Sequence, residues 1–296
     1  MKKSKKILLS VGALIISIIL LLLLGGSFIV YKIGVEPLDT DLTYIQAMNG
    51  FITGNADGEG EKQLKESSMR EDHRHISIYY EENFSELLPL TKETLDLAIE
   101  RNGELFGETD NIPFDLLVYE NFVEMNGFKL LGAKDAYYSN FQKVIAIHNS
   151  GKELLLAEDE LALYGFQQIL LHEYNHYAFY RRVSNPSHYP TWFIEGVAEY
   201  ASNDPEQVYY PHFETIPFAQ LNSIGQWEAA FSASLASPYM QSYYALEFLT
   251  AEHGEEVITQ IIDSVDETRN FEESFEEVTG LTLQELESAF LSSYKD

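Results

Sequence analysis

The chain has 296 residues, 45% of them hydrophobic, which is enough to bury a core in one domain of about 220 residues or in two closely joined lobes. It contains no cysteine, which excludes disulfides, a thiolate zinc site, a cysteine nucleophile and a lipid-modified cysteine anchor. The formal net charge of −28 disfavours binding to nucleic acid and to anionic lipid headgroups, because like charges repel.

The N-terminus is predicted to be a membrane anchor. Four of the first six residues are lysines, and the 24 residues from Ile7 to Val30 carry no charge. A helix of that length extends about 36 Å, enough to span a hydrocarbon core. Lysines favour the cytoplasmic side, so we expect a cytoplasmic tail (1–6), a single transmembrane anchor (7–31) and an extracellular remainder. A cleaved signal peptide is the alternative, but no clear small-residue cleavage site follows the apolar run.

Residues 32–72 are predicted to form a stalk or flexible linker. They include a cluster of Gly, Asn and Asp between Gly54 and Gly60, followed by a charged stretch up to Asp72. The cluster lacks the alternating ligands and the terminal glutamate of an EF-hand loop, so a calcium site is not predicted.

The folded domain is predicted to cover residues 73–296 and to begin with strands around one helix. Apolar patterns indicate strands over 75–80, 114–119 and 143–148, and helical periodicity extends from Leu87 to Phe106. We therefore expect a sheet lobe over residues 73–157 and a mostly helical lobe over residues 158–296.

The most informative motif is His172-Glu173-Tyr174-Asn175-His176, an HExxH pattern in an apolar segment. Positions i and i+4 share one face of a helix, so His172 and His176 can direct ring nitrogens at one metal ion, with Glu173 within reach of a water there. A catalytic zinc takes three protein ligands, and Glu195, after 18 intervening residues, is the natural third. Two surface histidines on an amphipathic helix are the alternative. The apolar flanks disfavour it, since buried His and Glu need partners.

A second motif, Trp192-x-x-Glu-Gly-x-Ala-x-Tyr200, follows the first. Together the two motifs resemble the gluzincin metallopeptidases, and especially the zinc aminopeptidases and the peptidase-MA-like domains of bacterial surface proteins. The resemblance implies an α+β, thermolysin-like catalytic domain with a small mixed sheet and a mostly helical C-terminal lobe. It implies that zinc is held by His172, His176 and Glu195, that Glu173 is the general base, and that Glu199 orients the first ligand histidine. Gly196 and Ala198 are expected to let the helix of Glu195 pack close to the HExxH helix.

Residues 237–249 resemble the segment in which these families place a tyrosine whose hydroxyl points at the developing oxyanion. Tyr239 is the best match, with Tyr243 and Tyr244 as alternatives; with 19 tyrosines in the chain, a packing role is the competing interpretation. His188 is a further candidate for stabilising the oxyanion. The tail from Phe271 to Leu286 also resembles the end of peptidase-MA-like domains.

One departure from the family bears on the type of peptidase. The aminopeptidases hold the substrate's free amine with a Gly-Ala-Met-Glu-Asn stretch, whereas the corresponding residues 131–138 here read Leu-Gly-Ala-Lys-Asp-Ala-Tyr-Tyr. Internal cleavage is therefore predicted in preference to exopeptidase action. In the gluzincin plan an edge strand pairs with the extended substrate, and residues 145–148 are the predicted edge.

The sequence thus predicts a membrane-anchored, extracellular zinc metalloendopeptidase acting on peptides or proteins. A zinc exopeptidase is one alternative. Another is a catalytically silent surface binding protein of the same fold, which the intact HExxH and glutamate positions disfavour.

Overall fold

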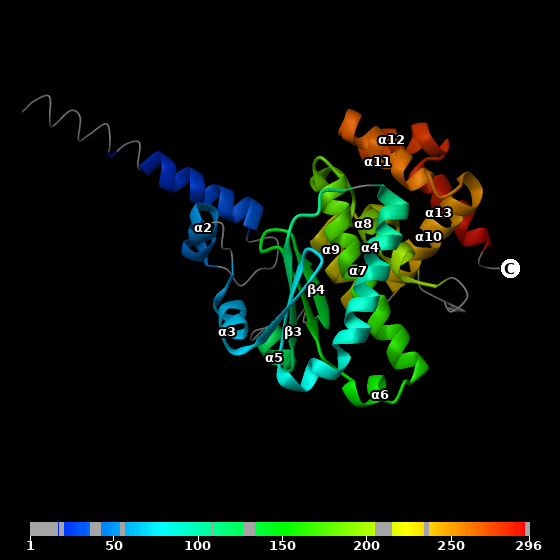
Figure 1. Cartoon of the computed structure of the whole chain (residues 1–296). Helices are drawn as coiled ribbons and strands as arrows, with labels where there is room; N and C mark the ends of the chain where they lie inside the picture. Colours follow the sequence, from blue (N-terminus) through cyan, green and yellow to red (C-terminus); the bar gives the residue numbers. More distant parts are fainter. Residues whose placement is uncertain are drawn as a thin grey trace, which may run out of the picture.

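The computed structural model describes most of the chain and shows the predicted α+β fold with a helical majority and a mixed sheet, which has five strands (Figure 1). The described residues are 17, 21–35, 43–53, 57–107, 109–126, 134–204, 215–233 and 237–293.

The strand order in the sheet is β1-β2-β3-β5-β4. The three inner strands are parallel to one another, and the two outer strands run antiparallel to their neighbours. The bounds are Met69–His73 (β1), Ile76–Tyr80 (β2), Phe114–Tyr119 (β3), Ala136–Ser139 (β4) and Val144–His148 (β5). The three predicted strands are therefore the inner ones. Both outer strands were missed, because β1 is polar and largely exposed and β4 has four residues.

The predicted substrate edge at residues 145–148 is wrong. These residues lie in β5, which is paired on both sides, with β3 and with β4. The run Val144 to Ile147 is buried throughout, as is typical of a strand covered on both faces. The edge of the sheet on this side is β4.

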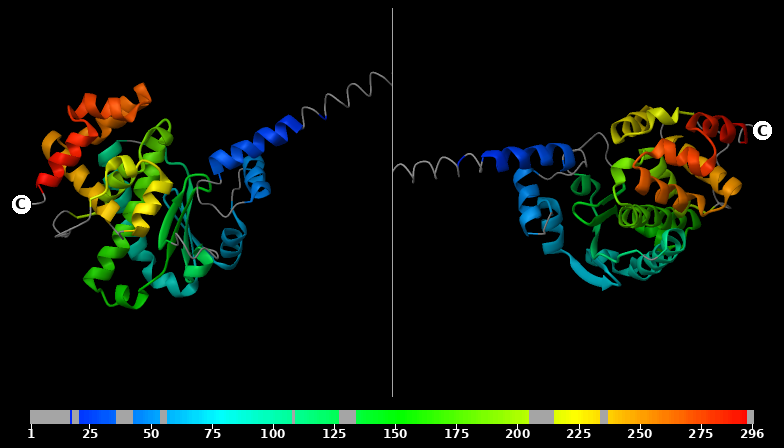
Figure 2. Two further views of the ribbon diagram at one scale, coloured as in Figure 1. Left: turned by 180° about the vertical axis from the view of Figure 1, so that it is seen from behind. Right: turned by 90° about the horizontal axis from the view of Figure 1, so that it is seen from above.

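Helices cover both faces of the sheet (Figures 1 and 2). Alternate residues such as Leu116 and Ile145 join the large core on the side of α4 (Leu88–Phe106) and α7 (Glu160–Arg182). Their neighbours Leu117 and Val144 pack on the other side, with Leu64 of α3 (Glu59–Ser67) and Met125 of α5 (Phe122–Asn126). The sheet is thus the middle layer of the lobe.

Part of the predicted stalk belongs to this layered structure. Besides β1, residues 32–72 contain α2 (Tyr44–Thr53) and α3. Leu64 is buried, and Lys65 bridges Asp57 (2.7 Å) and Asp115 of β3 (2.6 Å). The boundary at residue 72 was therefore placed too late. With Leu64 as its one large apolar residue in a charged stretch, α3 has the composition of a linker.

Apart from one short helix at Lys152–Leu156, which precedes residue 158, the remaining helices lie within residues 158–296, where a mostly helical lobe was predicted. Its last helices lie on the far side of α7 and α8 from the sheet (Figure 1). The bounds are Lys152–Leu156 (α6), Thr191–Ser202 (α8), Ile224–Ala233 (α9), Ser237–His253 (α10), Val257–Thr268 (α11), Phe271–Thr279 (α12) and Leu283–Ser293 (α13). Short helical turns occupy Tyr31–Val35 (η1), Glu82–Leu87 (η3), Pro186–His188 (η4) and Phe218–Gln220 (η5).

About half of the predicted anchor lies outside the described residues, which omit 1–16 and 18–20. Residues 21–30 are helical, and their leucines are exposed. No helix within the described ranges is both long and apolar enough to cross a membrane.

Gly196 allows a close contact between α8 and α10, not between α8 and α7 as predicted. A Cβ atom added there would lie 2.7 Å from Leu246 Cδ2, 3.1 Å from the Ser242 carbonyl oxygen and 3.2 Å from Ser242 Cβ. The backbone of α10 thus packs directly on the helix that carries Glu195.

We expect Gly196→Ala to lower the free energy of unfolding by about 1–3 kcal/mol, because the added methyl group overpacks this contact. Gly165→Ala on α7 is the matched control. A Cβ there meets nothing within 4 Å, so the better helix propensity of alanine should raise stability by about 0.5–1 kcal/mol. Urea denaturation of the two variants measures both effects. An equal change in the free energy of unfolding in the two variants would contradict the inferred contact.

Candidate metal centre and active site

The site is built on α7 and α8. α7 is 23 residues long and begins after Asp159, whose carboxylate accepts a hydrogen bond from the Ala162 amide (3.0 Å). It ends at Arg181 and Arg182, where cationic side chains complement the helix dipole. Residues of α7 are buried against the sheet and α4, which fixes the position of the helix. The HExxH residues are therefore held by a rigid element.

The loop between the two helices is also held in place. Ser184 donates from its amide and its hydroxyl to Asp266 of α11 (3.1 and 2.8 Å). The buried Tyr189 hydroxyl donates to the Ile262 carbonyl (3.1 Å). These contacts set where α8 begins, and with it the position of Glu195 relative to α7.

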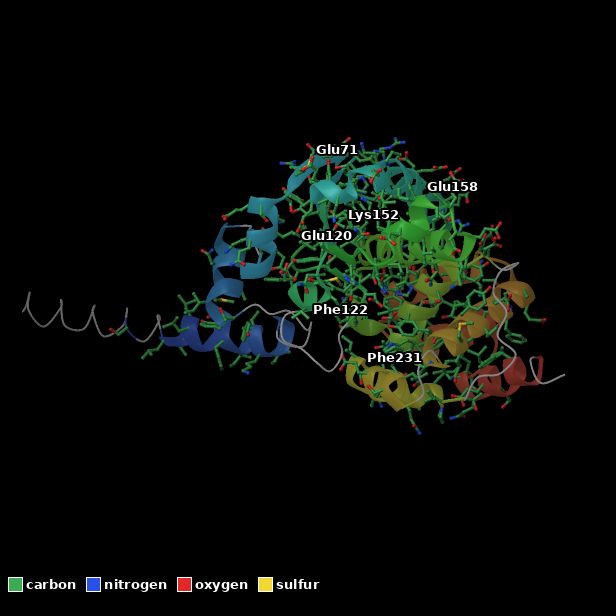
Figure 3. The ribbon with its side chains drawn as sticks, turned by 90° about the horizontal axis from the view of Figure 1, so that it is seen from below. Glu71, Glu120, Phe122, Lys152, Glu158 and Phe231 are labelled. Atoms are coloured by element: carbon green, nitrogen blue, oxygen red, sulfur yellow. The ribbon has the colours of Figure 1, made fainter. Side chains whose placement is uncertain are left out.

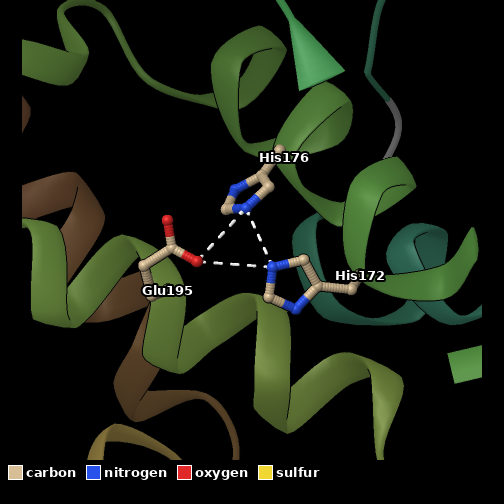
Figure 4. Close-up of side chains that lie close together, drawn as sticks. All are labelled: His172, His176 and Glu195. Atoms are coloured by element: carbon tan, nitrogen blue, oxygen red, sulfur yellow. Dashed lines mark hydrogen bonds and ion pairs between the residues drawn. The ribbon is translucent and has the colours of Figure 1, made fainter. Parts of the chain in front are cut away.

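The structure brings together the three residues predicted to bind metal (Figure 4). The Nε2 atoms of His172 and His176 lie 3.1 Å apart. Glu195 Oε2 lies 3.3 Å from His172 Nε2 and 3.5 Å from His176 Nε2. Three donor atoms from two helices therefore converge on one point.

This triangle fits a zinc ion. Ligands about 2.0–2.1 Å from a tetrahedral zinc are separated by about 3.3–3.4 Å, close to the three observed edges. Two imidazole nitrogens and one carboxylate oxygen are also a donor set that zinc accepts in catalytic sites. Glu195 Oε2 is buried and has no hydrogen-bond partner among the described residues, which a metal ligand would explain.

The electrostatics of the group also suit a cation. Burial lowers the pKa of His172, but Glu195 and Glu199 outweigh it and raise the pKa well above its usual value. Burial likewise raises the pKa of Glu195, yet His176 and His172 hold that pKa far below its usual range. The Glu195 carboxylate is therefore ionised and stabilises positive charge at this point.

Glu199 contacts the second ring nitrogen of His172, the position that the family resemblance implied for it. Its Oε1 atom lies 3.0 Å from His172 Nδ1. A ring proton on Nδ1, on the side of this carboxylate, would leave Nε2 free to bind a metal. Glu199 Oε2 accepts hydrogen bonds from Asn203 (2.8 Å) and Gln168 (3.4 Å).

Neither of these two amide side chains was predicted from the sequence. Gln168 precedes His172 by four residues, and Asn203 follows Glu199 by four. The i, i+4 rule could therefore have found the pair of Asn203 with Glu199, whereas Gln168 shares a helix face with His172 and reaches Glu199 only through the packing of α7 on α8. Asn203 is held in turn by the Tyr164 hydroxyl, which donates to its Oδ1 atom (2.8 Å).

Tyr239 is the predicted tyrosine that the structure places against the metal-binding group. Its ring centroid lies 6.0 Å from that of His172. Burial, and then the nearby Glu195 carboxylate, raise its pKa well above the usual value, so the hydroxyl keeps its proton and can donate a hydrogen bond. Tyr243 and Tyr244 are buried and pack on each other (5.2 Å between ring centroids).

The remaining predicted residues are placed as follows. Glu173 is buried on α7, next in sequence to His172. His188, considered for the oxyanion, instead pairs with Asn185 in its own loop (3.2 Å). The stretch at 131–138 lies partly outside the described residues, and its last three residues begin β4.

Comparisons with known proteins identify the family and the fold of the chain. A family model described as the Peptidase MA superfamily matches residues 96–295. A protein of Bacillus subtilis (strain 168), named Uncharacterized protein YhcO, is 30% identical over 246 residues, which are 82% of this chain and 76% of that protein.

A solved structure, Legionella pneumophila aminopeptidase A in complex with aspartic acid, shares the fold. The TM-score is 0.53 and the sequence identity 15%, over 76% of this chain. The match spans 27% of that aminopeptidase, so it supports an aminopeptidase-like fold and not the activity of the whole enzyme.

Proposed function

Because this chain belongs to the Peptidase MA superfamily, we propose that it is a zinc metallopeptidase that hydrolyses internal peptide bonds. The observation that carries the proposal is the convergence of His172, His176 and Glu195, with Glu173 next to His172 on α7. The first three residues would hold the zinc ion. When bound, zinc supplies a Lewis acid that polarises the scissile carbonyl and lowers the pKa of water.

The protein's own residues perform the proton transfers. Glu173 takes a proton from the attacking water as general base and passes it to the leaving amine. The Tyr239 hydroxyl donates a hydrogen bond to the oxyanion that develops on the carbonyl oxygen. Glu199 keeps the His172 ring in one tautomer and one orientation throughout.

We place the substrate backbone along β4. This strand is the edge of the sheet beside α7 (Figure 1). Tyr138 of β4 packs against Tyr177 and Tyr180 of α7, with ring centroids 6.1 and 5.8 Å apart. An extended peptide can add to such an edge through backbone hydrogen bonds, whatever its sequence.

The absence of the amine-binding sequence motif favours internal cleavage. The test compares two peptides of one sequence, one with free ends and one acetylated and amidated. We expect both to be cleaved at the same internal bond and at similar rates, as mass spectrometry of the products would show. Cleavage of the free peptide alone, one residue from its N-terminus, would identify an exopeptidase instead.

We also propose that residues 7–31 anchor the protein and leave the catalytic domain outside the cell. The support is the uncharged run after four lysines. The full chain should then remain in the membrane fraction after a carbonate wash, and its release by that wash would contradict the anchor.

A further inference from the structure

Helix α9 carries an apolar stripe beside the proposed active site. Ile224, Trp227 and Phe231 are spaced i, i+3 and i+7, which places them on one face of the helix. Trp227 is 5% exposed, whereas Ile224 and Phe231, at the two ends of the stripe, are 48% and 38% exposed. Figure 3 labels Phe231 on this helix.

The stripe packs on Tyr239. The rings of Trp227 and Phe231 meet the Tyr239 ring edge to face, with centroids 4.9 and 5.6 Å away and interplanar angles of 86° and 88°. Tyr239 is in turn 6.0 Å from His172. A single aromatic ring therefore separates the exposed surface of Phe231 from a residue of the metal-binding group.

We infer that Phe231, backed by Trp227, is one wall of the subsite for the substrate side chain next to the scissile bond. That side chain is large and apolar, as in Phe, Leu, Met or Tyr. A substrate carbonyl that accepts a hydrogen bond from Tyr239 must lie beside this tyrosine, so the neighbouring side chain is within reach of the same aromatic group. This inference rests on the proposed peptidase function.

Acidic side chains are disfavoured at this position. A carboxylate in this subsite would lose its hydration against the rings of Phe231 and Trp227, which is costly without a partner. An apolar side chain instead gains contact area with Phe231 and shields the reacting groups from water. The subsite therefore favours apolar side chains through contact and disfavours acidic ones through the cost of removing them from water.

The test uses the full chain with zinc and an unstructured protein as substrate, with cleavage sites mapped by mass spectrometry. The parent is expected to cleave next to large apolar residues. Two blocked peptides, with Phe or Ala at the mapped position, then give kcat/KM for each variant. Phe231→Ala should reduce the preference for the Phe peptide by about 5- to 10-fold, in the range of apolar pocket contacts, and leave the Ala peptide unchanged.

Two further variants sharpen the result. Phe231→Leu keeps an apolar wall and should lose less of the preference than Phe231→Ala. Leu161→Ala removes an 80% exposed leucine at the start of α7, eleven residues before His172, and should change nothing. Equal melting temperatures across the set would show that each variant is folded.

The outcomes distinguish an error in the subsite from an error in the proposed function. Cleavage by the parent without apolar preference, or an unchanged Phe-to-Ala ratio in Phe231→Ala, would overturn the subsite alone. Failure of the zinc-loaded parent to cleave any peptide would overturn both.

Discussion

Replacing Glu173 with Gln is expected to lower kcat/KM for peptide hydrolysis by about 10²- to 10⁴-fold while the zinc content of the protein stays the same. The amide has nearly the same volume as the carboxylate, so the buried position on α7 stays filled. It cannot accept a proton from water, however. Hydrolysis of a blocked peptide and metal analysis of the same sample measure the two quantities together.

Glu160→Gln is the matched control for this variant. Glu160 is exposed in the first turn of the same helix, and the same chemical change there should affect neither quantity. Turnover retained in Glu173→Gln at the level of the parent would remove Glu173 from the mechanism and favour a base from elsewhere in the site.

Replacing Glu195 with Ala is expected to weaken zinc affinity by more than about 100-fold. Loss of an outer hydrogen-bond partner already costs 10- to 100-fold, and Glu195 is proposed as a direct ligand. Its Oε2 atom lies within 3.5 Å of both histidine nitrogens, so its loss leaves two imidazoles and an open side to the site. Competition with a chromophoric chelator gives the affinity of each variant.

Glu252→Ala, at an exposed position of α10, is the control for the loss of one negative charge. It should bind zinc as the parent does, which would exclude a general effect of the strongly acidic surface. Equal zinc affinity in Glu195→Ala and Glu252→Ala would dismiss Glu195 as a ligand.

The spacing of residues in the sequence predicted which side chains share one face of a helix. The four-residue interval between His172 and His176 places both rings on one face whatever the rest of the fold does. Glu195 is different, because its position depends on the loop after α7 and on α11, which holds that loop through Asp266. Glu195 was predicted as the third ligand from its position after 18 intervening residues from His176, and the resemblance of the two motifs to a family supported that choice.

The errors in the fold have a common physical cause: they concern which elements become neighbours. The run of apolar residues in β5 indicates a strand, but its place inside the sheet depends on β4, a short strand with little sequence signal. Gly196 predicts a close helix contact, yet nothing local to α8 shows that the partner is α10. The composition of α3 resembles a linker although Leu64 and Lys65 attach it to the sheet.

Zinc-dependent cleavage of an internal peptide bond is tested most directly by stripping the full chain with a chelator and adding zinc back in known amounts. Cleavage of a blocked peptide should be lost on stripping and return in proportion to zinc, reaching its maximum at one ion per chain. The same titration of Glu173→Gln should restore the ion but not the cleavage. Cleavage that survives removal of the metal, or a zinc-loaded parent no more active than Glu173→Gln, would contradict a zinc peptidase.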